Sequence, residues 1–478
     1  MISAVLLALH WALAIALTLR LMFRKKPLGE SLAWLFVIYA LPLAGAAFYY
    51  AFGERRQGDR RVRRLETLSD RVGGFQQALS ESPSGLELPE DALAVPLARY
   101  VTRTTGFPVV MVKDCTLLET YDKVFAELVE RIDAAKHTCH LEFYIWESEG
   151  GVAAIEQALL RAAQRGVTVR ILVDSIGSDG FISSTTREEL EAAGCQFQVS
   201  MRMHLFGGRW DLRNHRKLVV IDDDWGLSGS MNLVDPELFK SDAGVGHWID
   251  AMVRVDGAGA QSLNAVFLQD WCVELSSSED HADLWQVPEL PAPTENRVAL
   301  QVLPSGPGIY SEAIHQVLMM AIYAADEEIL ISTPYFVPGE AILQALIAAA
   351  MRGVKVTIIV PETSDFRIAC YAGASNYTAL MEAGATIARF QKDLLHTKSI
   401  TIDGRVSFFG TVNIDMRSLW LNSEVTLLVY DRGFTAELRR VLMGYLDRSI
   451  QLDLDRWLER PALKRFLESA ARFLGPVL

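Results

Sequence analysis

The sequence predicts an α/β fold built from two similar lobes, preceded by an apolar N-terminal hairpin of two helices. Three observations support this prediction. A pattern of six residues occurs twice, 181 residues apart, and similar helical and strand segments surround each copy. Two long apolar segments lie within residues 1–54. Because six matched positions are very unlikely to recur by chance, we interpret the two copies as an internal repeat.

The repeated pattern begins with a histidine and a lysine two residues apart. The first copy consists of His215, Lys217, Asp222, Gly229, Ser230 and Asn232. At the same spacing, the second copy consists of His396, Lys398, Asp403, Gly410, Thr411 and Asn413. Apolar, β-branched residues follow each pair, which predicts a strand whose first two outward side chains, histidine and lysine, share one face. The segment up to each glycine is typical of a hairpin, which returns the hydroxyl and amide side chains to the histidine and lysine.

This set of side chains suits chemistry at phosphorus. A neutral imidazole is a nucleophile or base, and a protonated imidazole is an acid. Ammonium, hydroxyl and amide groups bind phosphate oxygens. We therefore expect a symmetric site in which one histidine from each lobe faces a single phosphodiester. Asp222 and Asp403 end their strands, so they either take part in the chemistry or anchor turns.

Matching segments outside the pattern predict an α/β/α sandwich in each lobe. Residues 120–136 have helical periodicity, and residues 140–146 are typical of a buried strand. A helix, a glycine and a parallel core strand follow over residues 155–174, and the same order returns over residues 342–361. Since strand, helix and strand recur in one order, each lobe should have a sheet covered by helices.

The chain is expected to contain five regions. They are two transmembrane helices (1–54), a basic and linker region (55–108), the first lobe (109–290), the second lobe (291–452) and a C-terminal amphipathic helix (453–478).

The N-terminal region has the composition of a membrane anchor. The segment Ile2–Phe23 and the 21 uncharged residues Leu32–Phe52 are each long enough to cross a hydrocarbon core of about 30 Å, and a shallow re-entrant hairpin is the alternative. Arginines after the second segment place the lobes on the cytoplasmic side by the positive-inside rule. The C-terminal helix either rests at the bilayer interface or packs against the second lobe.

Composition excludes several classes of function. The formal net charge of -13 argues against a nucleic-acid-binding protein, which would normally be basic. The five cysteines have neither disulfide nor metal-ligand spacing. No carboxylate cluster or glycine-rich phosphate loop indicates a metal or a nucleotide. We therefore expect chemistry without a metal or other cofactor.

The doubled histidine–lysine–aspartate pattern resembles that of the phospholipase D superfamily, in which two such motifs meet between similar lobes. The flanking stretches STPYFVPG (332–339) and NIDMRSLWLNSE (413–424), together with the N-terminal segments, resemble those of bacterial cardiolipin synthases. This resemblance covers essentially the whole chain. It implies an enzyme of the bacterial cytoplasmic membrane that transfers a phosphatidyl group from one phosphatidylglycerol to another, through a phosphatidyl-histidine intermediate.

The resemblance also implies roles for individual residues. Family precedent makes His215 the nucleophile and His396 the acid, although the sequence itself is symmetric. Asp250 and Glu424 are expected to bond the distal nitrogen of a catalytic histidine, although Ile249 stands where the family pattern has arginine. The catalytic set is then His215, Lys217, Asp222, His396, Lys398 and Asp403. The set that binds or orients the phosphate is Ser230, Asn232, Asp250, Thr411, Asn413 and Glu424.

Several alternatives remain open at this point. A phospholipase D that hydrolyses lipids has the same motifs, and phosphatidylethanolamine is another donor to consider. A superfamily nuclease fits the acidic charge poorly, and a lipid-binding scaffold would not need two intact motifs. Tyr335 and Arg417 are expected either to line the pocket or simply to pack. The oligomeric state is not predicted.

Overall fold

The computed structural model describes residues 2–24, 28–41, 43–54, 57–86, 91–202, 209–275, 282–286, 297–308 and 310–473. The chain divides into two compact units. The first unit contains residues 1–63 and 203–212, and the second contains residues 64–202 and 213–478. Both copies of the repeated pattern lie in the second unit.

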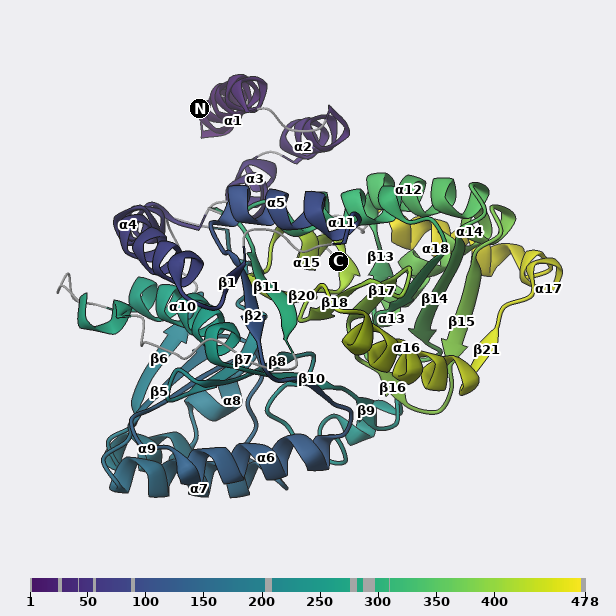
Figure 1. The fold of residues 1–478 in the computed structure, drawn as a ribbon. Coiled ribbons are helices and arrows are strands. Elements are labelled where there is room, and N and C mark those ends of the chain that lie inside the picture. The colour runs from purple at the N-terminus through teal and green to yellow at the C-terminus, as the bar shows by residue number, and fades with distance from the viewer. Residues whose placement is uncertain are drawn as a thin grey trace. The chain divides into compact units, whose positions relative to one another are not determined.

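Three helices make up most of the first unit, α1 (Ile2–Phe23), α2 (Leu28–Ala40) and α3 (Ala44–Phe52) (Figure 1). Buried apolar side chains join them, among them Leu21 of α1 and Ile38 of α2. Within the part of the chain that the structure describes, α1 is the one helix long and apolar enough to cross a membrane, over Val5–Phe23.

The expected second transmembrane helix is not continuous. The segment Leu32–Phe52 was predicted as one helix, whereas the structure has α2 with 13 residues and α3 with 9. At 1.5 Å per residue α2 is only about 20 Å long, which is shorter than a hydrocarbon core of about 30 Å. Leu43, with φ at 60°, interrupts the helix because a left-handed residue cannot continue it. Residue 42 lies outside the described residues.

The sheet of the first lobe has seven strands in the order β3-β10-β8-β7-β4-β5-β6. Neighbours β4, β5 and β6 are parallel, and the other neighbours are antiparallel. The strands are β3 (Cys115–Leu118), β4 (Thr138–Phe143), β5 (Thr168–Asp174), β6 (Gln196–Ser200), β7 (Lys217–Ile221), β8 (Trp225–Gly229) and β10 (Met252–Asp256).

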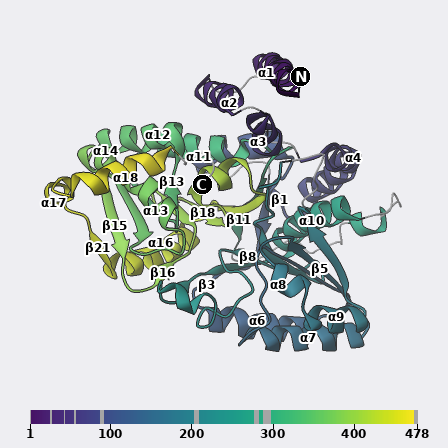
Figure 2. The same ribbon diagram turned by 180° about the vertical axis from the view of Figure 1, so that it is seen from behind.

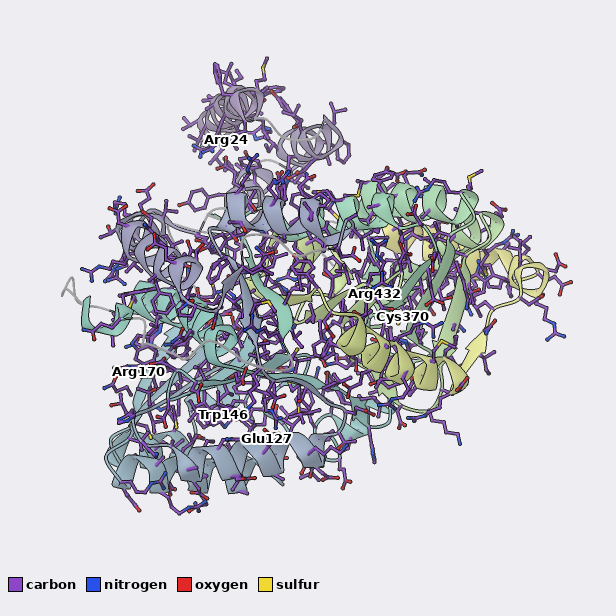
Figure 3. The ribbon with its side chains drawn as sticks, viewed as in Figure 1. Arg24, Glu127, Trp146, Arg170, Cys370 and Arg432 are labelled. Atoms are coloured by element: carbon purple, nitrogen blue, oxygen red, sulfur yellow. The ribbon has the colours of Figure 1, made fainter. Side chains whose placement is uncertain are left out.

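Helices cover both faces of this sheet. One face carries α6, α7 and α9, and the other carries α10 (Figure 1). Trp146, labelled in Figure 3, is fully buried among the side chains of α6, α7 and the sheet. The helices of this lobe are α6 (Tyr121–Ala134), α7 (Val152–Gln164), α8 (Asp179–Ile182), α9 (Thr185–Ala192) and α10 (Gly257–Glu274).

The second lobe repeats the strand order of the first. Its sheet contains β11-β20-β18-β17-β12-β14-β15, which matches the first sheet strand for strand, with β2 and β1 added at one edge and β21 at the other. The strands are β1 (Gly85–Leu86), β2 (Val109–Val112), β11 (Val298–Ser305), β12 (Glu328–Ser332), β14 (Lys355–Pro361), β15 (Thr386–Phe390), β17 (Ser399–Ile402), β18 (Val406–Gly410), β20 (Glu424–Val429) and β21 (Ser449–Gln451).

Helices α11, α12 and α14 pack on one face of this second sheet and α16 on the other, as both views of the ribbon show (Figure 2). The predicted pair of α/β/α sandwiches is therefore confirmed. The helices of the second unit outside the first lobe are α5 (Ala94–Thr105), α11 (Ala313–Ala324), α12 (Gly339–Met351), α13 (Arg367–Ala374), α14 (Tyr377–Glu382), α15 (Met416–Trp420), α16 (Arg432–Asp447), α17 (Leu454–Leu458) and α18 (Ala462–Arg472), while α4 (Asp59–Glu81) continues from the first unit.

The predicted boundary of the first lobe at residue 109 is wrong. Strand β2 pairs with β11 of the second sheet, and α5 packs in the core of that lobe, so the first sheet begins only at β3. The sequence does not reveal this pairing, because β2 and β11 are far apart along the chain. The boundary between residues 290 and 291 lies outside the described residues.

Helix α18 packs against the second lobe on one side only. Its Glu468 is buried and forms an ion pair with Arg460 at 3.1 Å. Its Ala471 contacts an apolar cluster that includes Ala372 of α13. Packing against the second lobe is thus confirmed for α18. Its other side exposes Phe466 at 68% and Phe473, just beyond the helix, at 87%. The single helix predicted over residues 453–478 is wrong, since the structure has two helices, α17 and α18, and Pro461 between them disfavours a helical residue before it. Residues 474–478 lie outside the described residues.

Candidate active site

Each histidine of the repeated pattern stands just before a strand. Strand β7 starts at Lys217, two residues after His215, and β17 starts at Ser399, three residues after His396. The predicted strands and hairpins are present, since β7 pairs with β8 and β17 pairs with β18 in antiparallel fashion. The strands begin slightly later than the sequence suggested, because the backbone of each histidine is bonded elsewhere.

Those backbone bonds bring the two motifs together. The N–H of His215 donates to the carbonyl of Ser423 at 2.9 Å, just before β20 of the second lobe. The N–H of His396 donates to the carbonyl of Ile249 at 2.9 Å, in the first lobe. Each histidine is therefore held by the backbone of the opposite lobe, at a point where that lobe also carries an acid.

The acid–histidine pairs cross between the lobes. The Nδ1 atom of His215 lies 2.9 Å from both carboxylate oxygens of Glu424. In the mirror arrangement, Nδ1 of His396 lies 2.8 Å from Oδ1 of Asp250. A neutral imidazole that donates through Nδ1 keeps the lone pair of Nε2 for another partner. Both imidazoles thus have the tautomer that suits attack or proton transfer through Nε2.

Burial controls the ionisation of this site. It lowers the pKa of His215 and of His396 to about 4, although each neighbouring carboxylate opposes the shift. Burial alone would raise the pKa of Asp250, but the bonded His396 outweighs it and holds that pKa at about 2. At neutral pH both imidazoles are therefore unprotonated and Asp250 is ionised.

The two lysines lie behind the histidines. Lys217 is 0% exposed and Lys398 is 2% exposed. Each Nζ donates to the carbonyl of the histidine in its own motif, at 2.7 Å and 2.5 Å respectively. Burial lowers the pKa of Lys217 to about 7 and that of Lys398 to about 8, and the ammonium of Lys398 depresses the pKa of Lys217 further. A phosphate bound nearby would favour their charged forms.

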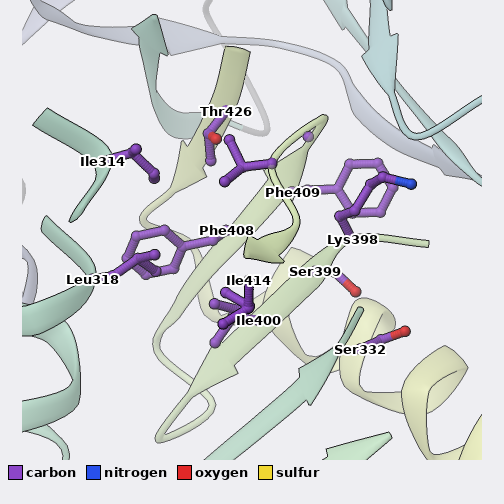
Figure 4. A pocket seen from close by; sticks show the side chains of 12 residues that line it. Ile314, Leu318, Ser332, Lys398, Ser399, Ile400, Phe408, Phe409, Ile414 and Thr426 are labelled. Atoms are coloured by element: carbon purple, nitrogen blue, oxygen red, sulfur yellow. The ribbon is translucent and has the colours of Figure 1, made fainter. Parts of the chain in front are cut away.

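The packing around Lys398 is visible in Figure 4, beside a small internal hollow of about 20 Å³. Phe408 points toward Leu318, and Phe409 points to the other side of the hairpin, where Lys398 lies (Figure 4). A hollow of this size holds about one water molecule. These phenylalanines fix the hairpin, and the hollow is too small for a substrate.

A much larger cavity, of about 470 Å³, lies between the lobes and is lined by both histidines. Asn232 and Asn413 also line it, as the sequence led us to expect of the amides, and so do Tyr335 and Arg417. This volume is within the usual range for small-molecule sites, about 300–1,000 Å³. One phosphodiester could reach both Nε2 atoms from this cavity.

The two hydroxyl residues of the pattern support the acids. Thr411 Oγ1 donates to Glu424 Oε2 at 2.5 Å. Ser230 Oγ accepts from the N–H of Ala251, next to Asp250, at 3.2 Å. Both side chains are 0% exposed, so they orient the acids and do not contact the cavity.

The geometry of Asp222 and Asp403 corrects their grouping with the catalytic residues. The carboxylate of Asp222 accepts three backbone N–H groups, from residues 136–138, at 2.7–2.8 Å. Asp403 does the same with residues 326–328 at 2.8–2.9 Å. Both stand at the far ends of their strands from the histidines, with φ at 52° in each case. They are the turn anchors of the structural alternative, since a short carboxylate tolerates this backbone and satisfies the amides.

The cavity wall contains residues that sequence reasoning missed. Tyr144, Arg213, Lys240, Trp248 and Asp365 line it. None of them belongs to the repeated pattern, and they lie in loops or at strand ends, so no spacing signal marks them. Arg213 and Trp248 stand two residues before His215 and Asp250, which the pattern and the resemblance single out, whereas the other three carry no such signal. Among the described residues, no group of three or more His, Cys, Asp or Glu side chains could hold a metal ion.

Comparison with known proteins gives a consistent result. A family model described as a cardiolipin synthase, phospholipase D-like domain matches residues 128–271 and 318–444, and a phospholipase D-nuclease N-terminal model matches residues 11–54. The matched stretches of the first model make up more than half of the chain.

Curated relatives match almost the full length. The chain is 38% identical to cardiolipin synthase A of Proteus mirabilis over 98% of this chain and 97% of the relative. It is 39% identical to cardiolipin synthase A of Yersinia pseudotuberculosis over the same shares of each chain. The solved structure of a phosphatidylserine synthase from Haemophilus influenzae has a TM-score of 0.58 at 16% identity, covering 80% of this chain and 100% of that one, which shows a shared fold.

Proposed function

Because this chain belongs to the bacterial cardiolipin synthases of the phospholipase D superfamily, we propose that it joins two phosphatidylglycerol molecules. It is a phosphatidyltransferase that makes cardiolipin. The finer proposal is that phosphatidylglycerol is both donor and acceptor and that the second product is glycerol. The observation that carries the mechanism is a pair of carboxylate-bonded histidines on one cavity.

The first half of the reaction breaks the donor headgroup bond. Nε2 of His215 attacks phosphorus, and the bond from phosphorus to the glycerol oxygen breaks. His396, which has taken up a proton when the anionic substrate binds, donates it from Nε2 to the leaving oxygen. Glycerol leaves, and a phosphatidyl group remains on His215. The carboxylate of Glu424 stabilises the positive charge that His215 acquires.

The second half reverses these steps with a new alcohol. A hydroxyl of the acceptor headgroup gives its proton to His396 and attacks phosphorus, while the bond from phosphorus to His215 breaks. Cardiolipin is released and His396 is again protonated for the next cycle. Asn232 and Asn413 face the nonbridging oxygens, and the lysine charges behind the histidines stabilise the extra negative charge in transfer. One phosphodiester replaces another, so the reaction requires no nucleotide.

The direct test uses purified protein in detergent micelles with phosphatidylglycerol, without nucleotide or divalent metal. We expect cardiolipin and free glycerol in equal amounts, and neither product with His215→Ala. Phosphatidic acid with glycerol would mean that water is the acceptor and that the enzyme is a phospholipase D. If cardiolipin forms only when phosphatidylethanolamine is added, and free ethanolamine is released, then phosphatidylethanolamine and not phosphatidylglycerol is the donor.

The enzyme is associated with a membrane, as its family and the apolar helix α1 indicate. We propose further that the lobes face the cytoplasm and that the N-terminal region crosses the membrane more than once, with α2 and α3 together forming a broken second crossing. The arginine-rich stretch that follows residue 54 supports this orientation by the positive-inside rule. Cysteine labelling from each side of sealed vesicles tests it. If a cysteine added at the C-terminus reacts with a labelling reagent supplied from the periplasmic side, the cytoplasmic orientation is contradicted.

A further inference from the structure

The cavity wall beside His396 carries a polar cluster that the internal repeat does not explain. Its members are Lys240 from the first lobe and Tyr335 and Asp365 from the second. The strand register β4–β7 and β12–β17 makes Ile145 the counterpart of Tyr335. An apolar residue thus stands in the first lobe where the second has a phenol. A feature present on one side only is suited to tell apart the two sides of a symmetric reaction centre.

Asp365 is the centre of this cluster. Its Oδ1 accepts a hydrogen bond from the Tyr335 hydroxyl at 2.7 Å, and its Oδ2 accepts from Lys240 Nζ at 2.9 Å. Lys240 Nζ also lies 5.6 Å from the ring centre of Trp248, whose ring centre is 4.5 Å from that of His396. The three polar groups therefore lie next to His396, and both lobes contribute to them.

The charges of the cluster are set for recognising alcohols. Burial would raise the pKa of Asp365, but the bonds from Lys240 and Tyr335 outweigh it, so the carboxylate is ionised at neutral pH. A carboxylate accepts hydrogen bonds from hydroxyl groups, an ammonium donates to them, and a phenol does either. Together the three groups can donate hydrogen bonds to a polyol and accept hydrogen bonds from it, which apolar side chains in their place could not do.

We propose that Lys240, Asp365 and Tyr335 form a polyol subsite that binds the headgroup hydroxyls of phosphatidylglycerol which do not react. This inference rests on the proposed function, in which His396 serves the departing and the attacking oxygen. By reversibility, the leaving glycerol and the acceptor headgroup use the same place. The subsite thereby holds an alcohol against the phosphatidyl-enzyme, where an unanchored water molecule is less well placed.

Such a subsite also selects between headgroups. Phosphatidylglycerol offers two hydroxyl groups to the cluster, whereas ethanolamine offers a single ammonium, which Asp365 attracts and Lys240 repels, so the two charges largely cancel. When the reacting oxygen is at phosphorus, a second hydroxyl of the same glycerol remains to be bound by Asp365. A site built to hydrogen-bond a hydroxyl rejects analogues that lack it, because its own polar groups are then left unpaired.

The test is the exchange of isotopically labelled free glycerol into phosphatidylglycerol, with phosphatidic acid and cardiolipin followed in the same samples. We expect Asp365→Asn and Tyr335→Phe each to raise the KM for glycerol at least tenfold while phosphatidic acid still forms. The matched control is Glu362→Gln, the same change at an exposed carboxylate in the same loop, which should leave exchange unaltered. Tyr335→Phe removes one oxygen only, and thermal unfolding of each variant establishes that it is folded.

The outcomes separate this inference from the mechanism it rests on. An unchanged KM for glycerol in both folded variants would overturn the polyol subsite. A wild-type protein that exchanges no glycerol and traps no phosphatidyl group would instead overturn the proposed transfer. Equal losses of glycerol exchange and of hydrolysis in both variants would also count against the subsite, because they would indicate general damage to the reaction centre.

Discussion

The two lobes are closely alike where bonds are made and broken, and differ in the walls around them. Each lobe supplies a histidine and an acid, and each acid serves the histidine of the other lobe. Beside His215, the ring centre of Tyr144 is 4.9 Å from the imidazole, and Arg213 and Arg417 also line that cavity. Beside His396 are Trp248 and the polyol subsite.

This difference suggests how a duplicated site acquires a direction. Two equivalent histidines are chemically able to exchange roles, so motif residues alone cannot decide which one attacks phosphorus. A wall that binds the alcohol beside His396 makes that histidine the partner of the alcohol oxygen. His215 then carries the phosphatidyl group, which is the assignment from which the subsite was inferred, so the two stand or fall together.

The strongest test of this asymmetry compares His215→Ala with His396→Ala. We expect His215→Ala to abolish the covalent phosphatidyl-enzyme, because its nucleophile is gone. In His396→Ala the intermediate should still form and decay, but about 10²- to 10⁴-fold more slowly, since only proton transfer is lost. Acid quenching with labelled lipid measures both. Covalent lipid trapped on His215→Ala would reverse the roles of the two histidines.

The acids that bond the two histidines allow the same comparison of His215 with His396 without changing either histidine. We expect Asp250→Asn to lower the pKa of His396 below about 4, because the carboxylate that raises it is gone. The acid form then becomes scarcer at every working pH, and turnover should fall about 10²-fold or more. Glu424→Gln should instead slow formation of the covalent intermediate on His215. Asp250→Asn should slow both formation and decay of the intermediate, because His396 transfers a proton in each step. Single-turnover kinetics separate these two patterns, and the same pattern in both variants would contradict the crossed pairing.

The buried lysines predict a pH dependence of kcat/KM. The pKa values of Lys217 and Lys398 are lowered to about 7 and about 8, so the charges that attract phosphate are present below these values and lost above them. The histidines set a second limit, because both of their pKa values are about 4: the productive pair of neutral His215 and protonated His396 is lost below about pH 4 and becomes scarcer above it. Lys217→Arg keeps its charge and should move the alkaline fall from about 7 toward 8. A profile that is flat from pH 6 to 9 would contradict this.

Sequence patterns predicted the features that depend on residues close together in the chain. The strands after each histidine, the hairpins and the sandwich order follow from periodicity, and the structure has them. What the patterns did not predict depends on contacts between distant segments. The bonds from Asp250 and Glu424 to a histidine were expected from the resemblance, but each acid serves the histidine of the other lobe, and this crossing, like the pairing of β2 with β11, is set by how the sheets meet. The wall residues around Asp365 come from separate loops, so they carry no common sequence signal.

Asp222 and Asp403 show that repetition does not by itself mean catalysis. Both recur because each lobe needs the same turn anchored. We expect Asp403→Ala to lower the free energy of unfolding by about 2 kcal/mol, since three backbone N–H groups lose their acceptor. Asp222→Ala should lower the free energy of unfolding somewhat less, because Asp222 is only half-buried. Chemical denaturation measures stability, and folded variants should retain near-normal kcat, whereas a thousandfold loss would restore a catalytic role.

The smallest expected effect concerns α18, which has no counterpart in the first lobe. Its exposed apolar side chains Leu463, Phe466 and Phe473 lie beside Lys464 and Arg465, a composition suited to anionic lipid surfaces. Because α18 contacts α13, and Ala369 of α13 lines the cavity, a bilayer held by α18 would lie on the side of the cavity that α13 forms. We expect Phe466→Ser with Phe473→Ser to weaken binding to phosphatidylglycerol vesicles severalfold in protein lacking residues 1–54, provided that form stays folded. Its kcat in micelles should not change, because these side chains do not line the cavity. Unaltered sedimentation with vesicles would show that the second lobe meets the membrane elsewhere.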